Sequence, residues 1–545
     1  MRKRIILIIS IVLTIAMITG LPLTGCKTGT PAETTAAAET TVAETASAET
    51  TAVETTAAAA ETSKQLESVR ISLSSKLVNL DITQMPWGQP DIITGYYISG
   101  RLFRLNMDWS LEPEMAESLE VSDDGLKATV KLKEGLLYSD GTPVKAEDVL
   151  FAFERQRDVP GHLYAPYLKQ IDSVEAIDDQ TVVFNMSVPY VDLQTVLGMT
   201  VISIHPKSLI ESDPDYFLHP VSAGPYVIKD WTPGDSSWVL EENPNYIRGP
   251  MAVKKVEFVT IPDQTSRVLQ LVAGDIDFVY DVSIPAIDSF PAEVTVSPAP
   301  LNGMYHVCFN LSLPEDHPLR NAKVRQAISL AINRAEINDK AFGGISIPAD
   351  SFQYQGPEEA LRGLFGAQDI EAAKALLAET PFADGFTVEL QTYSQRAGWK
   401  DAALVIAENL SEIGITAEVL PVEDAVAVAN LQAGTYEMIF SGNASPPMGF
   451  FRNQFYPGSF WTDAMHYNNP EVTKLLDEAS SAVSWEDRIN KIHEAQRLAY
   501  EDMPLMPICD RVVAVASRID PDILYIANMP PGTNPWIATL SELED

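Results

Sequence analysis

Side chains that could carry out covalent or acid–base chemistry are scattered along this chain and form no known catalytic pattern. The 545 residues include seven His and three Cys. They contain no G-x-S-x-G, H-E-x-x-H or P-loop motif, and no Cys and His residues at the spacing of a zinc site. We therefore predict that the chain is not an enzyme and uses no metal or cofactor.

The sequence indicates a covalent modification for Cys26, because this residue ends a segment typical of exported lipoproteins. Residues 2–4 are basic and residues 5–23 are mostly apolar, which predicts a secretory signal peptide. The segment 23–26, Leu-Thr-Gly-Cys, resembles a bacterial lipobox, in which the Cys carries a diacylglycerol thioether. A retained membrane-spanning helix is the alternative, but the uninterrupted apolar core is shorter than the ~20 residues that spanning requires. We expect a signal peptide at 1–25 and lipidation of Cys26.

Residues 26–65 are predicted to form a disordered tether between the lipid and the folded body. Ala, Thr and Glu dominate this segment, and Ala-Glu-Thr recurs five times. Such a composition cannot bury enough apolar surface to fold. A surface helix is the alternative, because Ala favours helix.

The composition of the remaining chain predicts a large folded body of two or three domains. Hydrophobic residues make up 46% of the sequence, which includes eight Trp. Three Cys are too few for a disulfide framework, so hydrophobic cores must stabilise the fold. The formal net charge of -37 lies almost entirely beyond residue 65. This charge should repel nucleic acid and anionic lipid, so we expect membrane contact only through the lipid anchor.

The order of the expected elements indicates two α/β sections. Residues 128–132 and 181–184 have strand patterns and belong to a β-rich section. An apolar strand at 305–309 opens a second section, whose first helix has apolar residues at i, i+3, i+4, i+7 and i+8 over 324–332. A return strand is expected near 504–512. One outgoing and one returning strand predict two lobes joined by two strands, and ligands favour such inter-domain crevices.

Short motifs in order along nearly the whole body resemble one family. They include residues 139–149 (SDGTPVKAEDV), 223–226 (AGPY), 243–246 (NPNY), 273–277 (AGDID) and 501–507 (EDMPLMP). Each motif is weak alone, but the ordered set is specific. It resembles the family 5 extracellular solute-binding proteins, which are the oligopeptide-, dipeptide- and nickel-binding components of ABC importers.

This resemblance implies an α/β fold of the type II periplasmic-binding-protein (Venus flytrap) class, with two lobes, a two-strand hinge and an extra β-rich subdomain. Lobe I would comprise residues 66–112, 200–300 and 506–545, the inserted subdomain 113–199, and lobe II 301–505. The resemblance also implies an extracytoplasmic protein that captures a solute between its lobes and delivers it to a permease driven by ATPases. A surface sensor or adhesive lipoprotein without a transporter is the alternative.

The same resemblance and the strand patterns indicate seven candidate ligand contacts. One Trp lies in the loop after the first strand, and one Tyr lies in a stretch that matches a cleft segment of the family. A His and a Cys alternate on the strand that crosses between the lobes, and aromatic residues near 460 could form an apolar platform. Packing within a core is the alternative for each. The candidates are Trp87, Tyr164, His306, Cys308, Phe440, Asn443 and Trp461.

One departure from the family leaves the ligand class open. Peptide-binding relatives have Gly-Trp where this chain has Gly442-Asn443, and they have a nearby Asp that pairs with the ammonium group of the ligand. Residues 438–462 of this chain contain no Asp or Glu. A buried ammonium group without a counter-charge costs several kcal/mol. Either another acid reaches the site or the ligand has no free amine, so both an oligopeptide and an oligosaccharide remain candidates.

Cys308 and Cys509 lie on the two expected crossing strands. If these strands run side by side, the two residues come near each other although they are 201 positions apart. A disulfide needs Cα atoms within about 7 Å and converging Cβ directions. We expect proximity without a bond.

Overall fold

The computed structural model describes most of the folded body. It covers residues 65–544 except 82, 85–88, 108, 158–167, 191, 200–202, 230, 283, 288, 395, 446 and 530–531. The expected signal peptide, the lipidated Cys26, nearly all of the tether and the candidates Trp87 and Tyr164 therefore lie outside the described residues.

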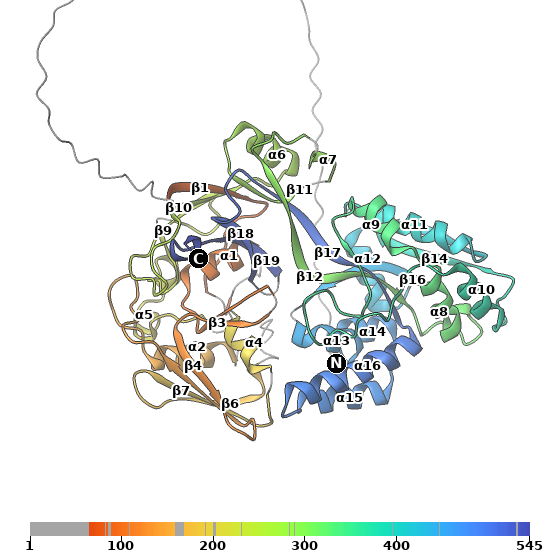
Figure 1. Cartoon of the computed structure of the whole chain (residues 1–545), viewed down its shortest axis with the longest axis horizontal. Helices are drawn as coiled ribbons and strands as arrows, with labels where there is room; N and C mark the ends of the chain where they lie inside the picture. Colours follow the sequence, from red (N-terminus) through yellow and green to blue (C-terminus); the bar gives the residue numbers. More distant parts are fainter. Residues whose placement is uncertain are drawn as a thin grey trace, which may run out of the picture. The chain divides into compact units, whose positions relative to one another are not determined.

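A mixed sheet of eleven strands runs through the described part of the chain (Figure 1). One end of the sheet belongs to lobe II and the other to lobe I, and β12 and β17 lie between them. β13 (Ile347–Pro348) pairs with β17 outside the main order. Across the sheet the strands are β15 (Ile415–Val422), β14 (Phe386–Tyr393), β16 (Met438–Ala444), β12 (Thr295–Phe309), β17 (Leu505–Ser517), β11 (Phe278–Val282), β1 (Leu66–Leu73), β10 (Val253–Thr260), β9 (Ser237–Glu242) and β8 (Tyr226–Lys229).

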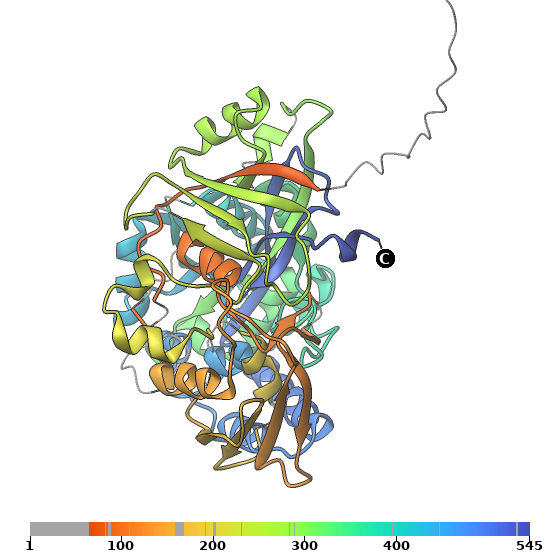
Figure 2. The ribbon, with the colours of Figure 1, turned by 90° about the vertical axis from the view of Figure 1, so that its left-hand side faces the viewer.

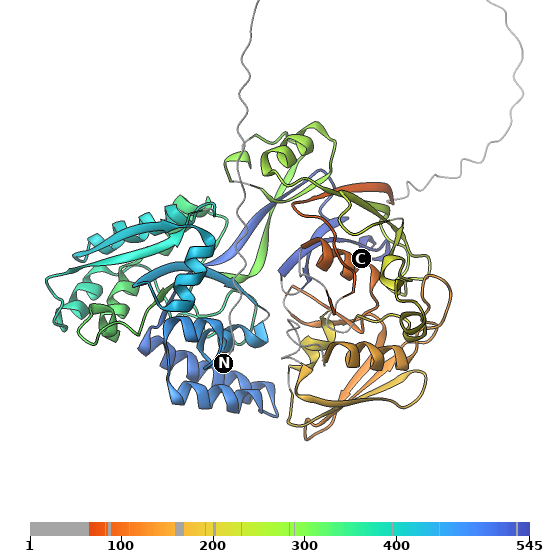
Figure 3. The ribbon, with the colours of Figure 1, turned by 180° about the vertical axis from the view of Figure 1, so that it is seen from behind.

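Lobe II contains helices that cover its part of the sheet (Figure 3). The amphipathic pattern at 324–332 is confirmed as a helix, because Val324, Ala327 and Ile328 are fully buried in α8. Asn321 begins this helix, since its side chain accepts a hydrogen bond from the Lys323 N–H. The helices are α8 (Ala322–Ala331), α9 (Arg334–Phe342), α10 (Ile370–Ala378), α11 (Trp399–Ser411), α12 (Asp424–Ala433), α13 (Pro447–Phe455), α14 (Phe460–Met465), α15 (Pro470–Ser480) and α16 (Trp485–Asp502).

Lobe I has its own core, centred on aromatic residues of α1. The ring of Tyr97 lies 5.3 Å from Tyr226 and 4.9 Å from Trp536, measured between centroids. Burying such rings dominates core energetics. The α-helices with described residues in lobe I and the insert are α1 (Gln89–Ile98), α2 (Ala146–Arg157), α4 (Leu193–Gly198), α5 (Lys207–Ser212), α6 (Gln264–Ala273) and α7 (Ile284–Ile287).

The β-rich insert is an antiparallel sheet packed against α2 (Figure 2). Its strands include the two predicted ones, and Phe153 of α2 meets Phe184 of the sheet edge to face at 6.3 Å. In order they are β4 (Ala116–Val121), β5 (Lys127–Leu132), β7 (Thr181–Met186) and β6 (Ile171–Ala176). Two hairpins complete the described strands: β2 (Phe103–Leu105) with β3 (Leu111–Pro113), and β18 (Leu524–Met529) with β19 (Gly532–Ile537).

The two strands β12 and β17 form the expected hinge between the lobes. They pair antiparallel along almost their whole length, from Thr295 opposite Ser517 to Cys308 opposite Leu505. Their register shifts between Pro300 and Met304, around the left-handed residue Asn302 (φ 50°), and again between Tyr305 and His306. The hinge therefore has an irregular stretch, from Pro300 to His306, between two regularly paired segments.

The register of β12 with β17 also determines how far apart Cys308 and Cys509 lie. Cys509 lies opposite Tyr305, three residues from Cys308, which corresponds to about 10 Å along the strand. Both thiols are free and buried, as expected. The strands are neighbours, but the cysteines are not opposite each other, so no disulfide forms.

None of the helices in the described part of the chain combines the length and the apolar character needed to cross a membrane.

We predict that only a glycine at position 303 allows β12 to lie as close to β16 as it does. A Cβ atom at this position would collide with the backbone oxygen of Asn443. We expect Gly303→Ala to lower the free energy of unfolding by about 1–3 kcal/mol in urea titrations, since β12 or β16 must shift. Gly366→Ala is the matched control, because a Cβ there meets nothing within 4 Å. Equal stability of the two variants would contradict the prediction.

Candidate functional site

Polar side chains gather on one face of the sheet where the hinge enters lobe II. In the register of β12 with β16, Asn443 lies opposite Met304 and Ser441 lies opposite His306. Directly opposed residues share a face, and diagonal neighbours are about 7–8 Å apart. His306, Ser441 and Asn443 therefore form one polar group beside the hinge.

His306 is the most unusual member of this group. Its side chain has no solvent exposure, and neither ring nitrogen has a hydrogen-bond partner. The ring stands perpendicular to that of Trp461, with 4.6 Å between centroids. Burial, assisted by the charge of Arg511, lowers the pKa of His306 to about 3. The imidazole is thus neutral and offers one donor and one acceptor.

Two amide side chains of lobe II also have unused hydrogen-bonding atoms. Asn443 is 9% exposed, and its Oδ1 has no partner. Gln454 of α13 is fully buried with both side-chain polar atoms unpaired. α13 packs against α14, since Thr462 donates to the Gln454 carbonyl. Unpaired buried polar groups cost about 1–3 kcal/mol each, so a hydrogen-bonding partner for these atoms would be stabilising.

The ionisable groups around this cluster come from β17 and its neighbour β11, and not from residues 438–462. Arg511 of β17 lies over the Tyr305 ring, 5.6 Å from its centroid, and its Nε is buried without a partner. Asp281 of β11 interacts electrostatically with Arg511. Asp510 lies opposite Met304 and accepts a 2.7 Å hydrogen bond from the Gln355 N–H. Burial raises the pKa of Asp510 to about 7, so its carboxyl group is only partly ionised at neutral pH.

Two of the seven candidates lie in the core of lobe II. Phe440 is fully buried and stacks with Tyr305 at 5.9 Å and meets Trp399 at 5.5 Å. Cys308 is fully buried in the same core, and burial raises the pKa of its thiol well above the ordinary value. The structure brings His306, Asn443 and Trp461 together, and it surrounds Cys308 and Phe440 with core residues.

A residue that the sequence did not indicate reaches this region from lobe I. Trp109, in the turn between β2 and β3, has a left-handed φ of 68°. It packs against a small cluster of lobe II that includes Met304, Tyr354 and Phe450. Met304 is only two residues from His306, so Trp109 links lobe I to the polar group. The only feature of the sequence that could have indicated Trp109 as a contact residue is its position in an otherwise largely polar turn.

A second contact joins the insert to lobe II. Asp192, at the start of α4, forms a 3.0 Å ion pair with Arg488 of α16, and Arg488 also bonds Glu359 at 2.6 Å. All three side chains are nearly buried. Burial raises the pKa of Asp192, and the nearby carboxylate of Glu359 raises it further, while the charge of Arg488 opposes both effects.

Among the described residues, no three His, Cys, Asp or Glu side chains are grouped so that they could hold a metal ion.

Comparisons with known proteins agree on one class of protein. Residues 110–480 match the family described as bacterial extracellular solute-binding proteins, family 5 middle. The glutathione-binding protein GsiB of Escherichia coli O1:K1 / APEC is 26% identical over 435 residues, which cover 76% of this chain and 84% of GsiB. Heme-binding protein A of Haemophilus influenzae is 27% identical over 446 residues, which cover 74% of this chain and 79% of that protein.

A solved structure has the same fold. The ABC transporter substrate-binding protein CtaP from Listeria monocytogenes superposes with a TM-score of 0.74 at 23% identity, over 83% of this chain and 94% of CtaP. The predicted two-lobed α/β fold of the type II class is thereby confirmed.

His306 is predicted to make stability depend on pH. Its folded-state pKa of about 3 lies below the ordinary 6.5, so folding requires a neutral ring. The contribution of the neutral His306 ring to the free energy of unfolding is complete above pH 6.5 and is lost as the pH falls toward 3. Between about pH 7.5 and pH 5, the native chain should lose about 2 kcal/mol more free energy of unfolding than His306→Phe.

Urea titrations at the two pH values measure this difference. His219 is 65% exposed and pairs with Asp213 at the surface. Such surface pairs contribute little to stability, so His219→Phe is the control and should behave much like the native chain. An unchanged pH dependence in His306→Phe would contradict the prediction.

Proposed function

The chain belongs to the family 5 bacterial extracellular solute-binding proteins, and on that premise we propose that it captures a peptide-like solute between its lobes for an ABC importer. Proteins of this family work outside the cytoplasm and bind peptides or similar ligands for a permease with its ATPases. The observation that carries the proposal is the buried, unpaired polar group of His306 and Asn443 beside the hinge. A solute with amide groups would supply the missing partners.

To capture the solute, the protein would bend at the hinge and change the contacts between the parts that the hinge joins. The irregular stretch around Asn302 gives β12 and β17 a place to bend, and hinges absorb such motion in a few residues. Trp109 on Met304 is a contact between lobe I and lobe II, and Asp192 on Arg488 is a contact between the insert and lobe II. A solute that touches both lobes favours the closed arrangement by its differential affinity.

The charges around the site favour a solute that does not need a free amine. The wall formed by residues 438–462 has no acid, and Arg511 places a cation near His306. Relatives named for glutathione and for heme support a small organic solute. An oligosaccharide is the second candidate, because Trp461 and Asn443 offer an aromatic face and a neutral amide.

A thermal-shift screen tests the proposal directly. It would compare glutathione, a set of tri- and tetrapeptides and a set of oligosaccharides on the purified chain. A ligand at 100 times its dissociation constant adds about 2.7 kcal/mol to the free energy of unfolding, which is easily measured. Stabilisation by peptides supports the proposal, stabilisation by sugars alone supports the second candidate, and no stabilisation by either contradicts both.

Acetylation of the amine of a binding peptide is predicted to change its affinity by less than threefold. No carboxylate of residues 438–462 can pair with the amine. Calorimetric titration of the free and acetylated peptide measures the ratio. A hundredfold loss, about 2.7 kcal/mol, would mean that an acid such as Asp510 pairs with the amine.

We also propose that the protein is held at the outer face of the cell membrane by a lipid on Cys26, through the tether of residues 26–65. The lipobox and the short apolar core support this anchor. The same anchor would suit a surface sensor or adhesive protein. Genes for a permease and ATPases beside this one would favour transport.

Cys26→Ser is predicted to abolish lipid labelling in cells fed a radioactive fatty acid, and to leave the precursor uncleaved or aberrantly processed. The thioether cannot form without the thiol. Cys509→Ser is a control that should keep normal labelling, because Cys509 is buried in the hinge. Persistent labelling of the Cys26 variant would rule out this anchor.

A further inference from the structure

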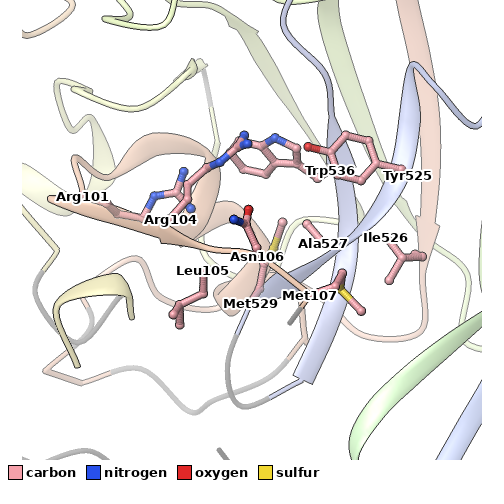
Figure 4. A pocket seen from close by; sticks show the side chains of 10 residues that line it. All are labelled: Arg101, Arg104, Leu105, Asn106, Met107, Tyr525, Ile526, Ala527, Met529 and Trp536. Carbon is pink, nitrogen blue, oxygen red and sulfur yellow. The ribbon is translucent and has the colours of Figure 1, made fainter. Parts of the chain in front are cut away.

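A pocket of about 130 Å³ lies in lobe I, away from His306, between the β2–β3 and β18–β19 hairpins. Figure 4 shows Arg101 and Arg104 beside the indole of Trp536, with Tyr525 near them. One water needs about 10–15 Å³ of such volume, so this pocket holds a group the size of a small organic acid.

Three polar atoms of the pocket lining are unpaired hydrogen-bond donors, and the amide of Asn106 adds both a donor and an acceptor group. Arg101 Nε, Arg104 Nη1 and Trp536 Nε1 are buried without a hydrogen-bond partner. None of these atoms can accept a hydrogen bond. Burial raises the pKa of Tyr525 to about 12, so its hydroxyl group also keeps its proton. The described residues that line the pocket include no Asp or Glu.

Acids outside the lining hold the arginines in place. Glu114 pairs with Arg101 at 2.9 Å, and Glu112 and Glu542 bond Arg104 at 2.7 and 2.8 Å. The Arg101 guanidinium also lies 5.0 Å from the centroid of Trp536. These contacts fix the donors in advance, which lowers the cost of ordering them when a ligand binds.

We propose that this pocket is a subsite for the carboxylate group of the captured solute. The inference rests on the proposed function, because it names a chemical feature of the same solute. A planar carboxylate matches the fixed guanidinium groups, and charge-assisted hydrogen bonds are about twice as strong as neutral ones. Trp536 and Met107 provide an aromatic and an apolar surface for the adjoining carbon atoms.

The location fits a subsite of a solute held at the hinge. Asn106 and Met107 line the pocket and belong to the same turn as Trp109, which packs against Met304 of lobe II. A solute that extends from His306 along this turn would place an acidic end at the arginines. The lobe II wall would then bind neutral groups, and lobe I would bind the charge.

Small fragments test the pocket independently of solute capture. Benzoate and benzamide have nearly the same shape and differ in charge, and ligand-observed NMR titration of the mature chain gives their dissociation constants. We expect millimolar binding of benzoate and about tenfold weaker binding of benzamide. Trp536→Phe removes one donor and should weaken benzoate about fivefold to tenfold.

Ala527→Leu is the second variant, because it adds apolar bulk to the pocket lining and keeps both arginines in the sequence. It should abolish benzoate binding, whereas Ala429→Leu, on the exposed side of α12, should leave it unchanged. Equal binding of both fragments, no binding of benzoate, or binding that survives Ala527→Leu would overturn the subsite. If benzoate binds as expected but no solute is captured in the thermal-shift screen, only the proposed function fails.

Discussion

The pairing of β12 with β17 is the constraint on which the rest of the structure depends. These two strands join the part of the sheet in lobe I to the part in lobe II, and each lobe builds its own hydrophobic core beside them. The long antiparallel pairing of β12 with β17 connects the two lobes. The break in pairing after Pro300 is where we expect the hinge to bend. His306, Asp510 and Arg511 lie on these strands, so any change in the hinge also moves the polar group that we assign to the ligand.

The electrostatics of the two lobes differ in a way that suits a solute with distinct ends. Lobe II offers neutral partners, His306 and Asn443, whose atoms are buried and unpaired. Lobe I offers guanidinium groups that glutamates hold in a fixed position. Because the whole chain is strongly acidic, an anionic solute needs such a local concentration of donors to bind.

Periodicity and motif order predicted most of the fold, because both depend on local sequence. The buried face of α8 follows from its apolar spacing, and the two crossing strands follow from the apolar runs that contain Tyr305 and Met506. The strand register could not be predicted, since a shift of two residues leaves the same side chains on the same face. This register determines that Cys509 lies opposite Tyr305. The lobe I pocket was missed because Arg101 and Trp536 are 435 positions apart and meet only in the folded chain.

The central claim, that the lobes close on a solute about this hinge, is tested most directly by a distance between them. Spin labels at the exposed positions Ile177 of the insert and Val483 of lobe II would report it by electron double resonance, because Cys308 and Cys509 are buried. If the lobes close on the solute, the distance distribution becomes shorter and narrower when the tightest ligand of the screen is bound. An identical distribution with and without a saturating ligand would contradict the central claim.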